Sequence, residues 1–352
     1  MPILIRLVLL ILGAGLITFL VLQTGPEAVW EMISALGVLA PLALIPYGFV
    51  YLLDTLGWRS SFPKQAIKKV GFWTFAKIRW AGEATNYVIP TAYLGGEALK
   101  VYLLTKKGIS SSHGAASAVT SKTAQTLAQV LFLVTGALVA LQHLPKESPL
   151  RFGMILIAVL ACVVFLGLII IQKIGFYRII SIIASKLGIA RSYFSQNQGV
   201  IEGIDQKIQQ FYGQTPRRFY LCVGYYLAGW MADTIEIWLV SHLIQSPITW
   251  TQALALEAFI GVAKILGMFV PGSLGVQESG VVWLCHLFGL PVVFGTSYAL
   301  LRRVREICYA AVGWTLLYSE FPDLTALRAT LKKLKEKGGE SDKGTIDPSP
   351  RA

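Results

Sequence analysis

The chain has 352 residues, of which 55% are hydrophobic and only 14% are charged. This composition excludes an ordinary soluble domain and is typical of an all-α protein with several membrane-spanning helices. The formal net charge of +12 does not indicate a nucleic-acid partner. The basic residues lie in loops beside apolar runs, where they obey the positive-inside rule and attract anionic lipid headgroups.

Six apolar runs are long enough to cross a hydrocarbon core of about 30 Å. The first run is longer than the core of a usual signal peptide and no small-residue cleavage site follows it, so we expect an uncleaved span. The second run contains Pro41 and Pro46, which are expected kink sites. The six predicted spans cover residues 3–22, 37–56, 113–141, 152–172, 219–244 and 296–317.

Residues 57–80 follow the second predicted span and mix basic with aromatic side chains. A helix lying in the headgroup plane and a simple basic loop both explain this mixture, and the aromatic residues favour the interfacial helix. The residues concerned are Arg59, Lys64, Lys68, Lys69, Lys77 and Arg79, and Phe62, Phe72, Trp73, Phe75 and Trp80.

Two further apolar segments, 82–104 and 251–288, contain helix breakers and cannot form uninterrupted helices. In both segments a glutamate follows a proline by seven residues, with a Leu-Gly pair between them. Broken backbone at membrane depth is tolerated only where protein or a water-filled cavity covers it. Two such segments in corresponding halves indicate the central binding site of a transporter. The predicted breakers are Pro90, Gly95 and Gly96 in the first segment, and Pro271, Gly272 and Gly275 in the second.

Charge in the flanking loops predicts how these segments enter the membrane. Basic residues flank segment 82–104, so we expect a re-entrant hairpin from the cytoplasmic side. The loops flanking segment 251–288 carry no charge, which indicates entry from the outside. The predicted fold is therefore six full spans and two re-entrant hairpins in an inverted repeat, with both termini in the cytoplasm.

Two polar regions complete the predicted domain organisation. Residues 173–218 are expected to form a cytoplasmic amphipathic segment within a membrane domain covering residues 1–320, because Ile201, Ile204, Ile208 and Phe211 follow a helical spacing. Residues 321–352 form a basic tail that ends in Gly, Ser, Asp and Pro, and we expect it to be largely disordered.

Ionisable residues within the membrane are candidate functional residues. Both signs of charge are present, so mutual neutralisation in buried pairs is the competing interpretation. Glu97 and Glu278 share the broken-helix context, which favours a functional role for both. The candidate residues for a headgroup cavity are Glu97, Lys100, Lys122, Glu257, Lys264, Glu278, Arg302 and Arg303.

Motifs for catalysis are missing from the sequence. It contains no H-E-x-x-H, no G-x-S-x-G in a strand-turn-helix setting and no Walker loop. We therefore expect no catalytic residue, no metal site and no cofactor, and we interpret the chain as a non-enzyme.

The motifs resemble those of the lysylphosphatidylglycerol synthase transmembrane region, also called the flippase-like domain, and in particular its hopanoid-biosynthesis-associated branch. The resemblance rests on Gly82-Glu83, the segment Gly95 to Leu104 after Pro90, the segment Pro271 to Glu278, and the Arg302/Arg303 span. It covers about residues 1 to 320.

That resemblance implies a bacterial inner-membrane protein that moves lipids between leaflets, with Glu97 and Glu278 at the positions of the family's motif glutamates. The family's usual P-G-G is Pro271-Gly272-Ser273 here. Long synthases of the family carry a soluble aminoacyl-transfer domain after this region, whereas only a short tail follows here, so lysyl transfer is not expected.

The sequence therefore predicts an inner-membrane translocase for a lipid whose headgroup is anionic or bears a phosphate. Two alternatives remain, a membrane-embedded enzyme and an accessory protein, each acting on a lipid-linked substrate in lipid or hopanoid biosynthesis. Membrane lipids are the expected partners, and enzymes of lipid synthesis are a second expected class.

Overall fold

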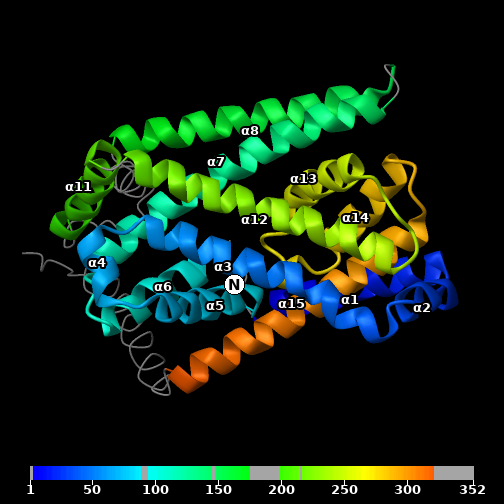
Figure 1. The fold of residues 1–352 in the computed structure, drawn as a ribbon, viewed down its shortest axis with the longest axis horizontal. Coiled ribbons are helices and arrows are strands. Elements are labelled where there is room, and N and C mark those ends of the chain that lie inside the picture. The colour runs from blue at the N-terminus through cyan, green and yellow to red at the C-terminus, as the bar shows by residue number, and fades with distance from the viewer. Residues whose placement is uncertain (1–2, 89–93, 145–146, 175–197, 215, 321–352) are drawn as a thin grey trace, which may run out of the picture.

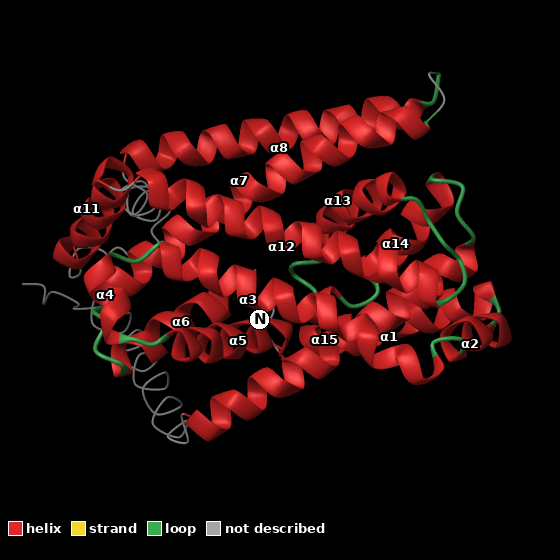
Figure 2. Ribbon diagram, in the orientation of Figure 1, coloured by secondary structure: helices red, strands yellow, loops and turns green. Residues whose placement is uncertain are grey.

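The computed structural model describes residues 3–88, 94–144, 147–174, 198–214 and 216–320, and this part of the chain consists of helices joined by turns and loops, with no strand (Figure 2). Three predicted features lie outside the described residues: Pro90, residues 175–197 of segment 173–218, and the tail 321–352. The helices are α1 (Ile3–Thr24), α2 (Pro26–Ser34), η1 (Gly37–Leu44), α3 (Ile45–Ser60), α4 (Lys64–Lys69), α5 (Phe72–Val88), α6 (Leu94–Lys106), α7 (Ser111–His143), α8 (Pro149–Ile174), α11 (Gln198–Gln214), α12 (Pro216–Leu243), α13 (Trp250–Leu266), η2 (Pro271–Ser273), α14 (Val276–Leu287) and α15 (Val292–Glu320).

Four stretches of the described helices are long and apolar enough to cross a membrane: 7–24, 37–60, 111–142 and 150–170. They correspond to the first four predicted spans. Helices α12 and α15 have 28 and 29 residues, which gives each a length of more than about 40 Å. Both carry several charged residues in their interiors, so composition alone does not mark them as spans. The fold is thus that of an all-α membrane protein.

The long helices pack as a layered bundle (Figure 1). Helices α7 and α8 form an antiparallel pair along one edge, and α12 packs against α3, α7 and α13. The largest buried apolar cluster joins α7, α12, α13, α14 and α15, with Phe132, Ile237, Phe259 and Phe294 among its members. This apolar packing holds the inner faces of the charged helices in fixed positions.

The second predicted span differs in detail from the expectation of a kinked α-helix. Residues 37–44 form a 3₁₀ helix that contains Pro41, and α3 begins at Ile45 with Pro46 in its first turn. Proline is tolerated in a first helical turn, where its missing N–H would have no intrahelical partner. The two prolines therefore separate two helix types.

The predicted interfacial helix over residues 57–80 is wrong in two respects. Helix α5 continues without a break from Phe72 into the segment that begins at Gly82. Phe62 and Phe75 are fully buried against Trp58, whereas Trp73 is exposed. Phe62 and Phe75 therefore stabilise the interior packing of this part of the bundle.

Helix α11 lies within the predicted amphipathic segment 173–218 and has a buried apolar face. Ile204 and Ile208 are buried against Ala116 of α7, at the end of the bundle where α4 and α6 also lie (Figure 1). Their spacing of four residues places them on one face of the helix.

Helices α5 and α6 pack closely because glycines remove side chains from their contact. A Cβ at Gly96 would lie 2.2 Å from the carbonyl oxygen of Gly82. The amide of Gly96 donates a hydrogen bond to Oδ1 of Asn86 at 2.8 Å. These contacts fix the start of α6, where Glu97 lies in the first turn.

Helix α13 ends at Leu266, and the predicted breakers Pro271, Gly272 and Gly275 lie in the connection between α13 and α14. Gly272 and Gly275 have φ values of 59° and 80°, which favour glycine. A Cβ at Gly275 would also lie 2.9 Å from the Cα of Gly13, so α1 packs directly on this break. Glycine at position 275 is required by both backbone conformation and packing.

Candidate functional site

A cavity of about 400 Å³ lies among α3, α5, α6, α7, α12, α13 and α15. Its charged lining has four acidic and four basic side chains, so its formal charge is balanced. These residues are Asp54, Glu83, Glu97, Asp233, Arg79, Lys122, Lys264 and Arg302. Tyr47, Tyr51, Tyr226 and Trp230 add aromatic surface. We call this space the main cavity.

The rim of the main cavity is partly apolar and exposed. Leu94 of α6 and Ile265 of α13 both line the cavity, and they are 70% and 44% exposed. The side chain of Lys122 is 40% exposed and lines the cavity.

A second cavity, of about 40 Å³, shares Tyr47, Glu83 and Lys264 with the main cavity. Its wall includes Tyr87 of α5 and Gly272 at the break before α14. Residues of both interrupted segments therefore meet at this small cavity, but neither motif glutamate, Glu97 or Glu278, lines it.

Three residues of α6 and α7 form the ion-pair group that we call the α6 cluster: Glu97, Lys100 and Lys122. Oε1 of Glu97 lies 2.8 Å from Nζ of Lys100 and 3.2 Å from Nζ of Lys122. Lys100 is buried, with its ammonium 4.9 Å from the centroid of the Trp58 ring. One carboxylate thus serves two ammonium groups, which leaves the cluster with one excess positive charge.

Across the cavity, Arg79 pairs with two carboxylates. Its Nη2 lies 2.5 Å from Oδ2 of Asp54 on α3 and 3.7 Å from Oε1 of Glu83, one turn along α5. Arg79 lies in the segment predicted to be interfacial, and its pairing with Asp54 and Glu83 was not predicted. Its spacing of four residues from Glu83 was the available signal, because residues i and i+4 share a helix face.

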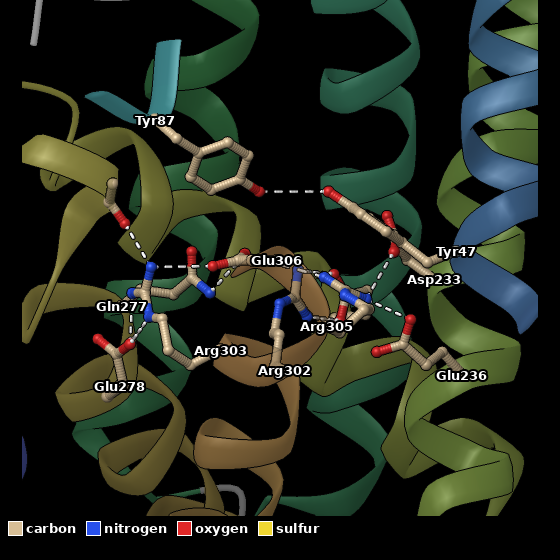
Figure 3. Close-up of polar contacts among 12 residues, drawn as sticks. Tyr47, Tyr87, Asp233, Glu236, Gln277, Glu278, Arg302, Arg303, Arg305 and Glu306 are labelled. Carbon is tan, nitrogen blue, oxygen red and sulfur yellow. Dashed lines mark hydrogen bonds and ion pairs between the residues drawn. The ribbon is translucent and has the colours of Figure 1, made fainter. Parts of the chain in front are cut away.

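Helix α15 carries four charged side chains that point towards different neighbouring helices: Arg302, Arg303, Arg305 and Glu306 (Figure 3). Arg302 makes two hydrogen bonds to Glu257 of α13, at 2.7 and 2.9 Å. Arg305 pairs with Glu236 of α12 and has Nη1 3.5 Å from Oδ1 of Asp233. Arg302 is thus the member of the arginine series that lines the main cavity, although its charge is compensated by Glu257.

The remaining charged residues of α15 pair with α14, and we call Gln277, Glu278, Arg303 and Glu306 the α14 cluster. Nε of Arg303 donates to Oε1 of Glu278 at 2.5 Å, and Nη1 lies 3.0 Å from Oε2 of Glu306 (Figure 3). Oε2 of Glu278 accepts the amide of Gly275 at 2.8 Å. The Glu278 carboxylate therefore closes the first turn of α14.

The candidate residues divide into three sets by position. Glu97, Lys122, Lys264 and Arg302 line the main cavity, and Lys100 contacts Glu97 behind it. Glu257 supports Arg302, whereas Glu278 and Arg303 line neither cavity. Within the described residues, no group of three or more His, Cys, Asp or Glu side chains is placed to hold a metal ion.

The model of the family described as the lysylphosphatidylglycerol synthase TM region matches residues 3–313. This match covers most of the chain and includes every helix that lines the cavities. The chain belongs to this family. Family membership and the apolar helices together identify it as a membrane protein. No curated protein and no solved structure matched the chain.

Proposed function

We propose that this member of the lysylphosphatidylglycerol synthase TM-region family is a flippase of the bacterial inner membrane. It would move a lipid with a charged headgroup between leaflets. The headgroup occupies the main cavity while its hydrocarbon tails remain in the bilayer. The observation that carries the proposal is the charged cavity of about 400 Å³ with an exposed apolar rim at Leu94 and Ile265.

Physical chemistry favours this use of the cavity. A charged headgroup cannot cross hydrocarbon without large desolvation cost, and a polar cavity replaces part of its hydration. Pockets of roughly 300–1,000 Å³ accommodate small organic ligands, so the cavity is of a suitable size for a headgroup alone. The tails do not need protein cover because lipid already surrounds the rim.

Transport is tested with the purified chain in phosphatidylcholine vesicles that contain a trace of fluorescent phosphatidylglycerol or phosphatidylethanolamine. Dithionite quenching reports how fast the labelled lipid reaches the outer leaflet. Thr126→Trp fills the main cavity from α7, and we expect it to reduce the rate at least tenfold. Leu138→Trp places the same side chain on the exposed face of α7 and serves as the matched control.

Two outcomes of this assay would refute the proposal. One is a rate no higher than that of empty vesicles with both labelled lipids. The other is equal transport by Thr126→Trp and Leu138→Trp.

Carboxylates that line a cavity also suit acid–base catalysis on a lipid-linked substrate, which is the alternative function. Mass spectrometry of the lipids after the transport assay separates the two, because translocation leaves the lipid chemically unchanged. A chemically altered lipid that requires the purified chain would establish the enzyme function instead.

A further inference from the structure

The two broken-helix motifs have the same sequence spacing but different surroundings. Glu97 faces the main cavity and is paired with two lysines, one of which is 40% exposed. Glu278 faces neither cavity and is paired with Arg303, whose side chain is only 11% exposed. Equal positions in the two repeats therefore do not imply equal roles.

The pairing in the α6 cluster is suited to exchange. Lys122 reaches Oε1 of Glu97 at 3.2 Å and donates to Oε1 of Gln125 at 3.0 Å. It has a flexible stem and three donors, so it can keep one partner while it changes another. If an anion takes Lys122, Glu97 still retains Lys100 at 2.8 Å. The cluster can therefore gain an anionic ligand without leaving a buried carboxylate unpaired.

The α14 cluster lacks these properties. Arg303 contacts Glu278 and Glu306 and donates a third bond to the carbonyl oxygen of Gly272 at 2.9 Å. The planar guanidinium holds these partners in one geometry, and removing any of them would leave a buried polar group unsatisfied. Its position joins α14 and the preceding break to α15, so its role is to fix the helix break.

We infer that the α6 cluster is an anion subsite and that Glu97 competes with the ligand for Lys122. The ligand group is a phosphate or another oxyanion of the headgroup, held by Lys122 with Lys100 behind it. Lys264 lines the same cavity and adds positive potential. The inference rests on the proposed function, in which a lipid headgroup enters the main cavity. It adds which group of the headgroup binds there and that Lys122 is its partner.

Competition makes an unusual prediction for Glu97→Gln. A carboxylate that binds the headgroup directly would be needed for affinity, so its loss would weaken binding. A carboxylate that competes for Lys122 lowers affinity, so Glu97→Gln is expected to bind a phosphate group about tenfold more tightly. The same variant leaves Lys100 buried without its carboxylate, which a bound oxyanion would compensate.

The test uses the purified chain in detergent with glycerol 3-phosphate and inorganic phosphate as probes, and sodium chloride at equal ionic strength as control. Phosphorus NMR line broadening reports binding, and ligand-induced thermal stabilisation reports it independently. We expect Lys122→Gln to lose at least tenfold in affinity and Lys122→Arg to retain most of it. Lys68→Gln removes one exposed positive charge elsewhere and should bind as the wild type does.

Glu278→Gln supplies the second comparison, because it should lower thermal stability while its folded fraction keeps wild-type affinity for phosphate.

Loss of phosphate binding in Glu97→Gln would overturn the inference, as would equal affinity in Lys122→Gln and Lys68→Gln. Wild-type protein that binds neither probe more strongly than chloride would overturn it as well. Lipid transport is measured separately in vesicles. Transport without phosphate binding would therefore refute only the anion subsite, and phosphate binding without transport would refute only the flippase proposal.

Discussion

Replacing Glu257 by glutamine is expected to be among the most destabilising single changes in the protein. Glu257 is fully buried and Arg302 is 3% exposed. Two hydrogen bonds of 2.7 and 2.9 Å join them. Breaking a buried ion pair by removing one partner costs about 3–5 kcal/mol, because the other charge stays buried. At about 1.4 kcal/mol per factor of ten, this lowers the folding equilibrium constant by roughly two to four orders of magnitude.

Equilibrium unfolding in mixed detergent micelles measures this loss. The double variant Glu257→Gln with Arg302→Gln removes both charges and leaves two amides that can bond to each other. We expect it to recover more than half of the stability lost by the single variant, which gives a favourable coupling energy in a double-mutant cycle. Glu31→Gln on the exposed side of α2 should have no effect. A single variant as stable as the wild type, or strictly additive losses, would refute the reasoning.

Two glycine substitutions test the packing of the interrupted segments. Gly275→Ala should lower stability by at least about 1–3 kcal/mol, because φ is 80° and the new Cβ would lie 2.9 Å from Gly13. Gly96→Ala should separate α5 from α6, since its Cβ would meet the carbonyl oxygen of Gly82 at 2.2 Å. Gly153→Ala on α8 is the control, because its added Cβ would have no atom within 4 Å. Thermal unfolding should show no loss of stability for this variant. Equal losses of stability in all three variants would contradict the packing argument.

Residue chemistry alone predicts the parts of the fold that depend on local backbone preferences. Pro271, Gly272 and Gly275 lie within five residues and together disfavour a continuous helix, so an interruption of segment 251–288 was predictable, although α13 already ends at Leu266. The apolar spacing of Ile204 and Ile208 likewise predicts the buried face of α11. Gly96 shows the limit of such reasoning, because it was a predicted breaker but lies within α6, where it permits close packing against α5. Sequence does not distinguish a glycine that breaks a helix from one that admits a neighbour.

The partners of the buried arginines were not predictable for a geometric reason. Successive residues on an α-helix are rotated by about 100°, so Arg302, Arg303 and Arg305 point towards different neighbours. The sequence contains enough acidic residues to pair with them, but it does not specify the rotation of α12, α13 and α14. Tertiary packing determines the ion pairs: Arg302 pairs with α13, Arg303 with α14 and Arg305 with α12. Mutual neutralisation therefore describes these arginines better than the open headgroup site expected for Arg303.

The same geometry explains why the two motif glutamates differ despite equal spacing. Helix α15 follows α14 directly and carries three arginines, so Glu278 has a planar guanidinium partner with a fixed fork geometry. Helix α7 follows α6 and supplies Lys122, an ammonium on a flexible stem that lines a cavity. A glutamate in the first turn is compatible with either role, because it is stabilised by the helix dipole in both. The cation on the next helix, and its access to the main cavity, is what separates a binding residue from a structural one.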